Sequence, residues 1–265
     1  MRDSDYATLR LEYPLARVLQ ITLDRPAAAN AFNTRMAGEL MQCFESLALE
    51  PGDTRCLVIT GAGERAFCAG GDLKERDGMS DEAWFAQHRI YERMIRAIID
   101  CPLPLIAAVN GAAYGGGCEL AAAADFVYAA DSARFAMTET SLGIIPGAGG
   151  TQNLARALGE RRAKELILSA RRFDAAEAQC WGLVNEVFAP AQLLAETLQT
   201  AERIAANAPL AVRQAKQAIH RGLQMSLGDG LAFEIEAYNR TVPTADRREG
   251  VSAFNQKRTP EFEGR

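Results

Sequence analysis

The sequence of 265 residues is poor in several features that mark particular classes of protein. Its only two histidines, His88 and His220, lie far apart with no cysteine beside them, so we expect no zinc site. Its six cysteines form no Cys-x-x-Cys pair, which favours free thiols in a reducing, cytoplasmic setting over a disulfide framework. No apolar run approaches the roughly 20 residues of a membrane-spanning helix, and the first residues contain no signal-peptide core. We therefore expect no membrane partner.

The chain also lacks an excess of basic residues. It has 29 Lys and Arg against 34 Asp and Glu, which gives a formal net charge of -5. A nucleic-acid partner usually requires a basic face, so we expect none. With 48% hydrophobic and 24% charged residues the chain has enough apolar surface for a substantial core, and its length predicts one main domain with a smaller appendage.

Hydrophobic periodicity predicts that short strands and helices alternate along most of the chain. The predicted strands cover residues 8–13, 17–23, 56–60, 105–109, 126–130, 135–137 and 184–188. Predicted helices begin near residues 34, 80, 115 and 151, and the chain is helical from 190 onward with breaks at Pro209, Gly228 and Pro243. The pattern predicts an α/β core of repeated strand, glycine loop and helix units over residues 1–195, followed by an α-helical region over 196–265.

Two polar residues in the predicted helices receive structural interpretations. His88 lies on the apolar stripe of the helix that Ser80 caps, which predicts a packed core or interface histidine rather than a catalyst. Asp125 ends the alanine-rich helix, and we expect its carboxylate to make structural hydrogen bonds.

The first of three glycine clusters, residues 61–66, fits the loose pattern G-x-G-x-x-A of dinucleotide-binding loops. That pattern must open a helix, whereas here it leads into a further glycine-containing segment, Phe67 to Leu73. No cluster ends in the Gly-Lys-Ser/Thr of a phosphate-binding loop. Neither dinucleotide binding nor nucleotide hydrolysis is expected.

Two glutamates accompany the other glycine clusters. Glu119 is a lone charge in a small apolar helix that follows the three glycines 115–117, whose free N–H groups suit a developing oxyanion. Glu139 follows an apolar segment and precedes the glycine loop 146–150. Together they form a candidate acid and base pair. The alternatives are a surface Glu119 that complements the helix dipole, and a Glu139 in a helix terminus capped by Thr138.

At these residues the chain resembles the crotonase family, also called the enoyl-CoA hydratase/isomerase superfamily. The matching segments follow one another over almost the whole chain and comprise residues 24–26, 30–32, 66–75, 110–120, 135–152 and 248–250, the last together with Phe254 and Lys257. The resemblance implies a spiral of ββα turns followed by an α-helical trimerisation region, commonly in a dimer of trimers. It also implies an acyl-CoA thioester as substrate.

The resemblance implies a role for four residues of the site. Gly71 and Gly116 fall on the two backbone N–H groups that hold the thioester oxygen as it becomes an enolate. Glu119 falls on the glutamate that deprotonates the water attacking the β-carbon, and Glu139 on the glutamate that supplies a proton to the α-carbon. Because both carboxylates are present, hydration is favoured over isomerisation. No metal or organic cofactor is expected, since coenzyme A is part of the substrate.

The resemblance also implies a set of substrate contacts. Ala27 and Ala29 fall on the path of adenine and pantetheine, where many relatives carry a basic side chain. Phosphate contacts would then come from Lys74, or from Lys257 of a neighbouring subunit, with Phe254 near the adenine. For Lys257 an ordinary solvated lysine is the alternative. Further residues expected to line the groove are Ala69, Asp72, Leu73 and Tyr114. The resemblance implies that the acyl pocket is formed by the segment around residues 75–85 and by C-terminal helices.

Other functions remain open at this point. The segments 73–80 and 135–139 are most similar to the methylglutaconyl-CoA hydratase branch, so a branched dicarboxylic substrate is a candidate. An enoyl-CoA isomerase is the alternative enzyme, and Glu119 would then be dispensable. RNA binding, which relatives in that branch suggest, is disfavoured by the acidic balance. A catalytically silent scaffold is disfavoured by the presence of both glutamates and both glycines.

Overall fold

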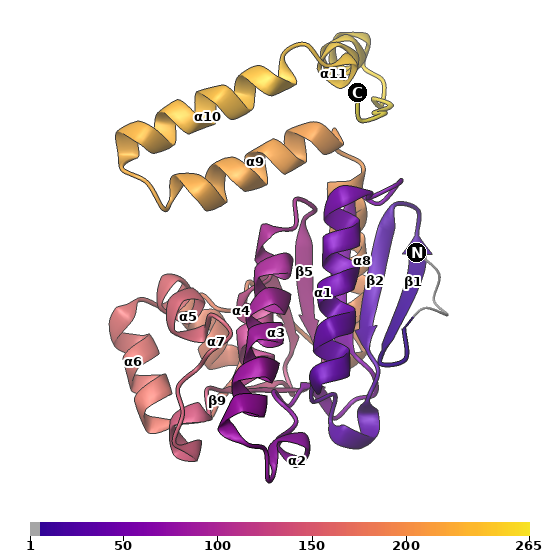
Figure 1. Ribbon diagram of the computed structural model, residues 1–265. Coiled ribbons are helices and arrows are strands. Elements are labelled where there is room, and N and C mark those ends of the chain that lie inside the picture. The colour runs from indigo at the N-terminus through magenta and orange to yellow at the C-terminus, as the bar shows by residue number, and fades with distance from the viewer. Residues whose placement is uncertain (1–5) are drawn as a thin grey trace.

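Two β-sheets organise the computed structural model, which describes residues 6–265 (Figure 1). The larger sheet has the strand order β1-β2-β3-β5-β7-β10, and the smaller one has the order β4-β6-β8-β9. The larger sheet consists of β1 (Leu9–Leu15), β2 (Val18–Leu23), β3 (Cys56–Gly61), β5 (Leu105–Val109), β7 (Phe126–Ala130) and β10 (Glu186–Phe188). The smaller sheet consists of β4 (Ala66–Cys68), β6 (Ala112–Tyr114), β8 (Arg134–Ala136) and β9 (Phe173–Asp174).

Helices cover the sheets and form the C-terminal part of the chain. The helices before β9 are η2 (Pro26–Ala28), α1 (Thr34–Leu49), α2 (Leu73–Arg76), α3 (Asp81–Asp100), α4 (Gly116–Ala122), η3 (Glu139–Leu142), α5 (Gly150–Leu158) and α6 (Glu160–Ser169). The later helices are α7 (Ala175–Trp181), α8 (Pro190–Ala205), α9 (Pro209–Gly222), α10 (Leu227–Thr241) and α11 (Ala245–Gln256).

The chain builds a spiral, because each unit adds one strand to each sheet. The successive strand pairs β3 and β4, β5 and β6, and β7 and β8 are each followed by helices. The first strands of these pairs lie parallel as neighbours in the larger sheet, and the second strands lie parallel in the smaller sheet. The expected spiral of ββα turns is confirmed. Its repetition brings the loops after β4, β6 and β8 to one side of the molecule.

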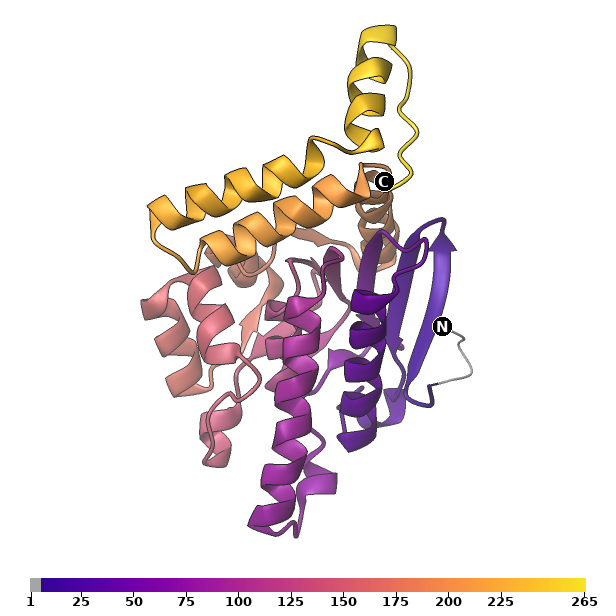
Figure 2. The ribbon, with the colours of Figure 1, turned by 45° about the horizontal axis from the view of Figure 1, so that its top comes forward.

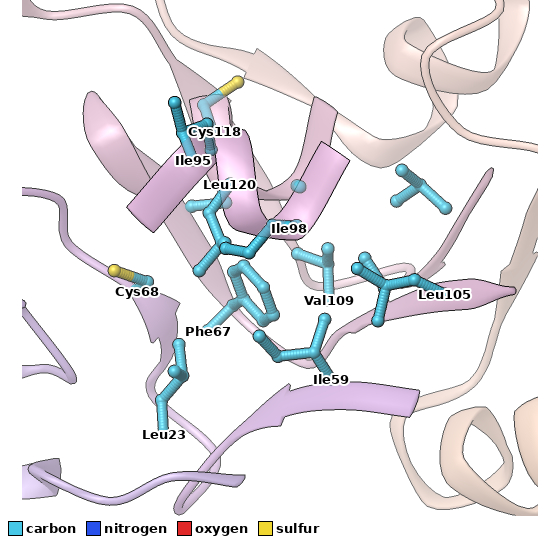
Figure 3. Packing of buried hydrophobic residues seen from close by; sticks show 14 of the residues in the cluster. Leu23, Ile59, Phe67, Cys68, Ile95, Ile98, Leu105, Val109, Cys118 and Leu120 are labelled. Atoms are coloured by element: carbon cyan, nitrogen blue, oxygen red, sulfur yellow. The ribbon is translucent and has the colours of Figure 1, made fainter. Parts of the chain in front are cut away.

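The central strands of the larger sheet are almost entirely apolar because both of their faces are covered. All residues of β3 and β5 are buried, as is typical of parallel strands covered on both faces. Leu57 and Ile59 of β3 pack into the main core with α1 and α3, whereas Cys56 and Val58 pack on the opposite face with residues of α8. In Figure 3, Ile59 of β3, Phe67 of β4 and Leu120 of α4 belong to one packed cluster of buried side chains.

Most predicted elements are confirmed, and the differences have local reasons. The strand β9 was not predicted, because two residues give no periodicity. Pro14 does not end the first strand but lies within β1, where the pairing register shifts between Glu12 and Leu15. Gly228 lies inside α10, so the break between α9 and α10 precedes it.

The expected boundary between residues 195 and 196 falls inside α8. This helix packs against the larger sheet through Leu193, Ala201 and Ala205, so its residues belong with the core. The C-terminal helices α9 to α11 extend from the core at the end opposite to α2 (Figures 1 and 2). The side chain of Lys216 in α9 anchors them, because Nζ lies 2.8 Å from both Asp125 Oδ2 and the Leu103 carbonyl oxygen.

Asp125 has the structural role that its position indicates. Besides Lys216, its Oδ2 accepts a 2.7 Å hydrogen bond from the backbone N–H of Leu105. Within residues 6–265 no disulfide joins any of the six cysteines, of which Cys180 is exposed and the other five are buried. Among residues 6–265 no helix is both long and apolar enough to cross a membrane.

The close approach of α4 to β4 makes Gly117 a sensitive position. A Cβ atom there would lie 1.9 Å from the carbonyl oxygen of Cys68. We expect Gly117→Ala to lower the free energy of unfolding by about 1–3 kcal/mol, because the backbone of α4 or β4 must shift. Chemical denaturation measures this change.

Gly38 provides the matched control, since a Cβ there would meet no heavy atom within 4 Å. Gly38→Ala should raise the free energy of unfolding by about 0.5–1 kcal/mol, as expected for alanine in a helix interior. Equal effects of the two substitutions would contradict the packing described for α4.

Candidate active site

A cavity of about 390 Å³ opens where the loops after β4, β6 and β8 meet. Its wall contains Gly71 before α2, Gly116 and Glu119 of α4, and Glu139 of η3. These are the four residues for which the sequence predicted a chemical role, and the structure brings them to one cavity. Three successive turns of the spiral supply them.

Close packing leaves space only for glycine in part of this wall. A Cβ atom on Gly116 would lie 2.4 Å from Cζ of Phe32, and one on Gly70 would lie 3.0 Å from the backbone nitrogen of Gly116. Gly70 also has a φ of +91°, which L side chains rarely adopt. The backbone segments 70–71 and 115–116 therefore approach each other across the cavity.

The backbone N–H groups of Gly71 and Gly116 are available to a ligand. Phe32 pairs with the segment around Gly71, but Gly71 makes neither of the two hydrogen bonds. The N–H of Phe32 donates to the carbonyl oxygen of Gly70 at 2.9 Å, and the N–H of Asp72 donates to the carbonyl oxygen of Phe32 at 3.0 Å. Gly116 is the first residue of α4, so its N–H has no partner in the preceding helical turn. Neither N–H donates to an acceptor within residues 6–265. Two such donors facing one cavity are suited to binding a negatively charged oxygen.

Glu119 is buried, and the loop that precedes α5 holds its carboxylate. Oε1 accepts hydrogen bonds of 2.8 Å from the backbone N–H groups of Ala148 and Gly150. Burial raises the pKa of Glu119 to about 7, with a further increase from Glu139, although the two backbone donors act in the opposite direction. The carboxyl group therefore changes its protonation state near neutral pH, as a general base requires.

Glu139 offers a second buried carboxyl group at the same cavity. Its Oε2 is buried and has no hydrogen-bond partner within the described chain, and burial raises its pKa. Its Oε1 lies on the side of Gly115, where a Cβ atom would be 3.0 Å away. A buried carboxyl oxygen without a partner is costly unless it is protonated or binds a ligand or water. The proposed alternatives, a surface Glu119 and a merely capping Glu139, do not fit this burial.

The remaining predicted contacts do not all line the cavity. Ala69 and Leu73 line the cavity. Ala29 lies next to it, since its carbonyl oxygen accepts a 3.0 Å hydrogen bond from the N–H of Ala69. Ala27 belongs to the short helix η2, which ends at the C-cap residue Ala29. Asp72 does not line the cavity; its carboxylate caps α2 and pairs with Arg25 at 2.9 Å.

Four further predicted residues lie outside the cavity. Tyr114 packs beneath Arg172, whose guanidinium carbon is 5.2 Å from its ring centroid, and Lys74 is exposed. Phe254 and Lys257 lie at the end of the molecule opposite to α2, where Phe254 is 84% exposed. Within a single chain these two residues do not approach the cavity, so their contact with substrate through a neighbouring subunit stays a prediction.

One wall of the cavity is formed by α2 and the start of α3, within the segment around residues 75–85 that the resemblance implies for the acyl pocket. His88 was expected in a core or interface, yet it is half-buried in the cavity wall, and Nε2 lies 3.6 Å from Oε1 of Glu92. Arg76, Trp84 and Phe85 of this segment line the cavity. Leu142, Ile144 and Ile145, which were not predicted as contacts, line it as well. Within residues 6–265 no group of three potential metal ligands comes together.

Comparisons with known proteins identify a family and several relatives to which this chain is similar. Residues 15–265 match the family model described as enoyl-CoA hydratase/isomerase. The 2,3-dehydroadipyl-CoA hydratase of Escherichia coli is 44% identical over 250 residues, 94% of this chain and 96% of that protein. The short-chain-enoyl-CoA hydratase of Clostridium acetobutylicum is 39% identical over 91% of this chain and 92% of its own length. The crystal structure of an enoyl-CoA hydratase from Bacillus anthracis has a TM-score of 0.96 at 44% identity, covering 98% of this chain and 100% of that one.

The raised pKa of Glu119 makes a prediction about stability. Between about pH 4.5 and about pH 7 the folded protein binds a proton that the unfolded chain releases, so this group's stabilising contribution is lost as the pH rises. Glu119→Gln keeps the accepting oxygen and removes the charge. We expect it to raise the free energy of unfolding at pH 8 by about 1–3 kcal/mol, with the gain disappearing towards about pH 4.5.

Urea denaturation at several pH values measures this difference. Glu202→Gln changes an exposed residue of α8 and should leave stability nearly unchanged throughout. A Glu119→Gln variant less stable than the wild type at pH 8 would contradict the assignment of a buried, costly charge.

Proposed function

Because the chain belongs to the enoyl-CoA hydratase/isomerase family, we propose that it is a hydro-lyase that reversibly adds water to a trans-2-enoyl-CoA and forms the 3-hydroxyacyl-CoA. The observation that carries this proposal is the pairing of two buried carboxyl groups with two unoccupied backbone donors in one cavity. Hydration of a conjugated double bond needs those parts: a base at one carbon, an acid at its neighbour and a clamp on the carbonyl oxygen.

In the proposed mechanism, the N–H groups of Gly71 and Gly116 donate to the thioester oxygen. Negative charge grows on this oxygen when the nucleophile attacks the β-carbon, and the donors stabilise the enolate more than the substrate. Removing one such donor typically costs about 3 kcal/mol in the barrier. The steric limit at Gly116 set by Phe32 keeps its N–H at the cavity wall.

Glu119 acts as the base and Glu139 as the acid. The ionised Glu119 takes a proton from water while the oxygen of that water bonds to the β-carbon. The π electrons of the double bond shift towards the thioester carbonyl, and negative charge collects on its oxygen. Collapse of the enolate then takes a proton from Glu139 to the α-carbon. The pair ends with Glu119 protonated and Glu139 ionised, and exchange of one proton restores it. Burial raises the pKa of both carboxyl groups, so near neutral pH the coupled pair can hold the one proton that this division of roles requires.

The proposal includes no metal or organic cofactor, because the chemistry is supplied by carboxyl and backbone groups. Coenzyme A enters as part of the substrate. Its phosphates would be bound by Lys74, or by Lys257 of a neighbouring subunit, with Ala27 and Ala29 beside the pantetheine.

A homotrimer or a dimer of trimers completes the proposal. Helices α9 to α11 expose a series of large apolar side chains, which favours their burial between subunits. These side chains are Ile219, Leu223, Leu227, Leu231, Ile235, Tyr238, Val242, Val251 and Phe254.

The alternatives differ in chemistry or in substrate. An enoyl-CoA isomerase would move a proton within the substrate and need only one carboxylate, which the presence of both buried glutamates disfavours. The acyl group remains open between short chains and dicarboxylic chains such as the methylglutaconyl group. The names of the two relatives, a short-chain hydratase and a 2,3-dehydroadipyl-CoA hydratase, support both classes.

Kinetics with crotonyl-CoA test the proposed roles directly. We expect the wild type to remove the absorbance of the conjugated thioester, and Glu119→Gln and Glu139→Gln each to lower kcat by about 100- to 10,000-fold. Glu202→Gln, on an exposed face of α8, should retain the wild-type rate.

Two outcomes would contradict the proposal. If crotonyl-CoA and longer enoyl-CoAs are all unreactive with the wild type, the hydratase assignment fails. If Glu119→Gln still isomerises a trans-3-enoyl-CoA at the wild-type rate while hydration is absent in both proteins, the isomerase is the correct function.

A further inference from the structure

One cation in the cavity wall has no role in the proposed hydration chemistry. Arg76, the last residue of α2, lines the cavity beside Trp84 and Tyr91. A Cβ atom on Gly71 would lie 3.8 Å from both Cζ and Nη1 of Arg76. The guanidinium group therefore lies next to the site proposed for the thioester oxygen, in the wall of the same cavity.

The guanidinium group is fixed in place by its neighbours. Its Nε donates a 2.8 Å hydrogen bond to Oε1 of Gln87. Its Cζ lies 4.1 Å from the centroid of a Trp84 ring and 5.0 Å from that of Tyr91. Gln87 is itself held, because its Nε2 donates at 2.8 Å to both Thr34 and Glu75. Such fixation reduces the entropy lost when the group binds a ligand.

The two terminal nitrogens of Arg76 remain unused. Within residues 6–265 neither Nη1 nor Nη2 donates a hydrogen bond, and no carboxylate forms an ion pair with this arginine. The nearby acidic side chains have other partners: Glu75 binds Thr34 and Gln87, and Asp72 pairs with Arg25. A partly buried guanidinium with free, coplanar donors is suited to bidentate binding of a carboxylate.

We propose that Arg76 selects acyl-CoA substrates that carry a carboxylate on the acyl chain, beyond the reacting double bond. This inference rests on the proposed hydratase function and names the substrate class of the same site. The rest of the acyl wall is formed largely by apolar side chains, including Leu142, Ile144 and Ile145, which suit the carbon chain itself. In this wall Arg76 is the group that compensates the charge of the terminal carboxylate.

The other charges around the cavity make this compensation necessary. Glu119 and Glu139 face the same space, and either one in its ionised form repels a second carboxylate. His88 also lines the cavity, but its Nε2 lies 3.6 Å from Glu92. Without Arg76 a dicarboxylic substrate would enter a site with more negative than positive charge.

Matched substrate pairs test the proposal. The five-carbon pair is trans-2-pentenoyl-CoA and glutaconyl-CoA, and the six-carbon pair is trans-2-hexenoyl-CoA and trans-2-hexenedioyl-CoA. Each pair differs only by a methyl group or a carboxylate at the end of the chain. For at least one pair we expect the wild-type kcat/KM to be about 10- to 100-fold higher for the carboxylated member. A charge-assisted, bidentate contact with Arg76 provides binding free energy of this size.

Substitutions then assign the preference to Arg76. Arg76→Gln should lower kcat/KM for the preferred carboxylated substrate by about 100-fold and leave the methyl-terminated partner within about threefold. Arg76→Lys, which keeps the charge but not the planar fork, should show an intermediate loss. Arg96→Gln removes a positive charge from an exposed position of α3 outside the cavity and should change neither rate.

The outcomes separate this inference from the proposed function. If the wild type hydrates methyl-terminated substrates at least as well as both carboxylated partners, the hydratase stands and the role of Arg76 is wrong. If Arg76→Gln lowers both members of a pair equally, the arginine supports the wall or the coenzyme A moiety, and the inference is again overturned. If no substrate is hydrated by the wild type, the proposed function itself has failed.

Discussion

The hydrogen bonds between the buried carboxylate of Glu119 and the backbone N–H groups of Ala148 and Gly150 are the interaction on which the site depends. They join α4 to the loop before α5, two elements that belong to successive turns of the spiral. The contact leaves no space for a side chain, because a Cβ atom on Gly150 would lie 2.8 Å from Oε1 of Glu119. Burying this carboxylate raises its pKa to about 7, so the same contact that costs stability supplies a base for neutral pH.

The spiral explains why chemistry gathers at one place. Each turn places a strand end and its following loop at the same edge of the smaller sheet, so groups from three turns face one cavity. The first turn supplies Gly71 and Arg76, the second Gly116 and Glu119, and the third Glu139. The rigid stacking of parallel strands fixes these groups relative to one another. The wall formed by the start of α3 shapes the space for the acyl chain.

Local signals in the sequence predicted most of the fold. The helix α3 begins after Ser80, whose hydroxyl accepts a 3.2 Å hydrogen bond from the N–H of Ala83. Its apolar stripe is buried from Tyr91 onward, whereas Trp84 and His88 are half-buried. The strand β9 is too short to give a period, and pairing with β8, including the stacked rings of Phe135 and Phe173, creates it. His88 was misplaced because periodicity shows which face of a helix meets the protein but not where that face passes a cavity.

The site was predictable in its residue types and not in its contacts. Motifs indicated Glu119, Glu139 and the two glycines, whereas nothing in the sequence indicated that the loop 146–150 holds Glu119. These partners are 29 and 31 residues apart, a pairing that only the folded spiral brings about. Arg76 was unremarkable in the sequence because nothing local shows that its guanidinium packs on Trp84 inside the cavity.

The pH dependence of kcat/KM for crotonyl-CoA tests the central claim, that a buried Glu119 with a raised pKa is the base. Measured from about pH 5.5 to about pH 8.5, the account predicts a rise in activity with an apparent pKa of about 7, which belongs to the coupled pair of glutamates. A profile that is flat across this range, or one that falls as the pH rises through 7, would contradict it.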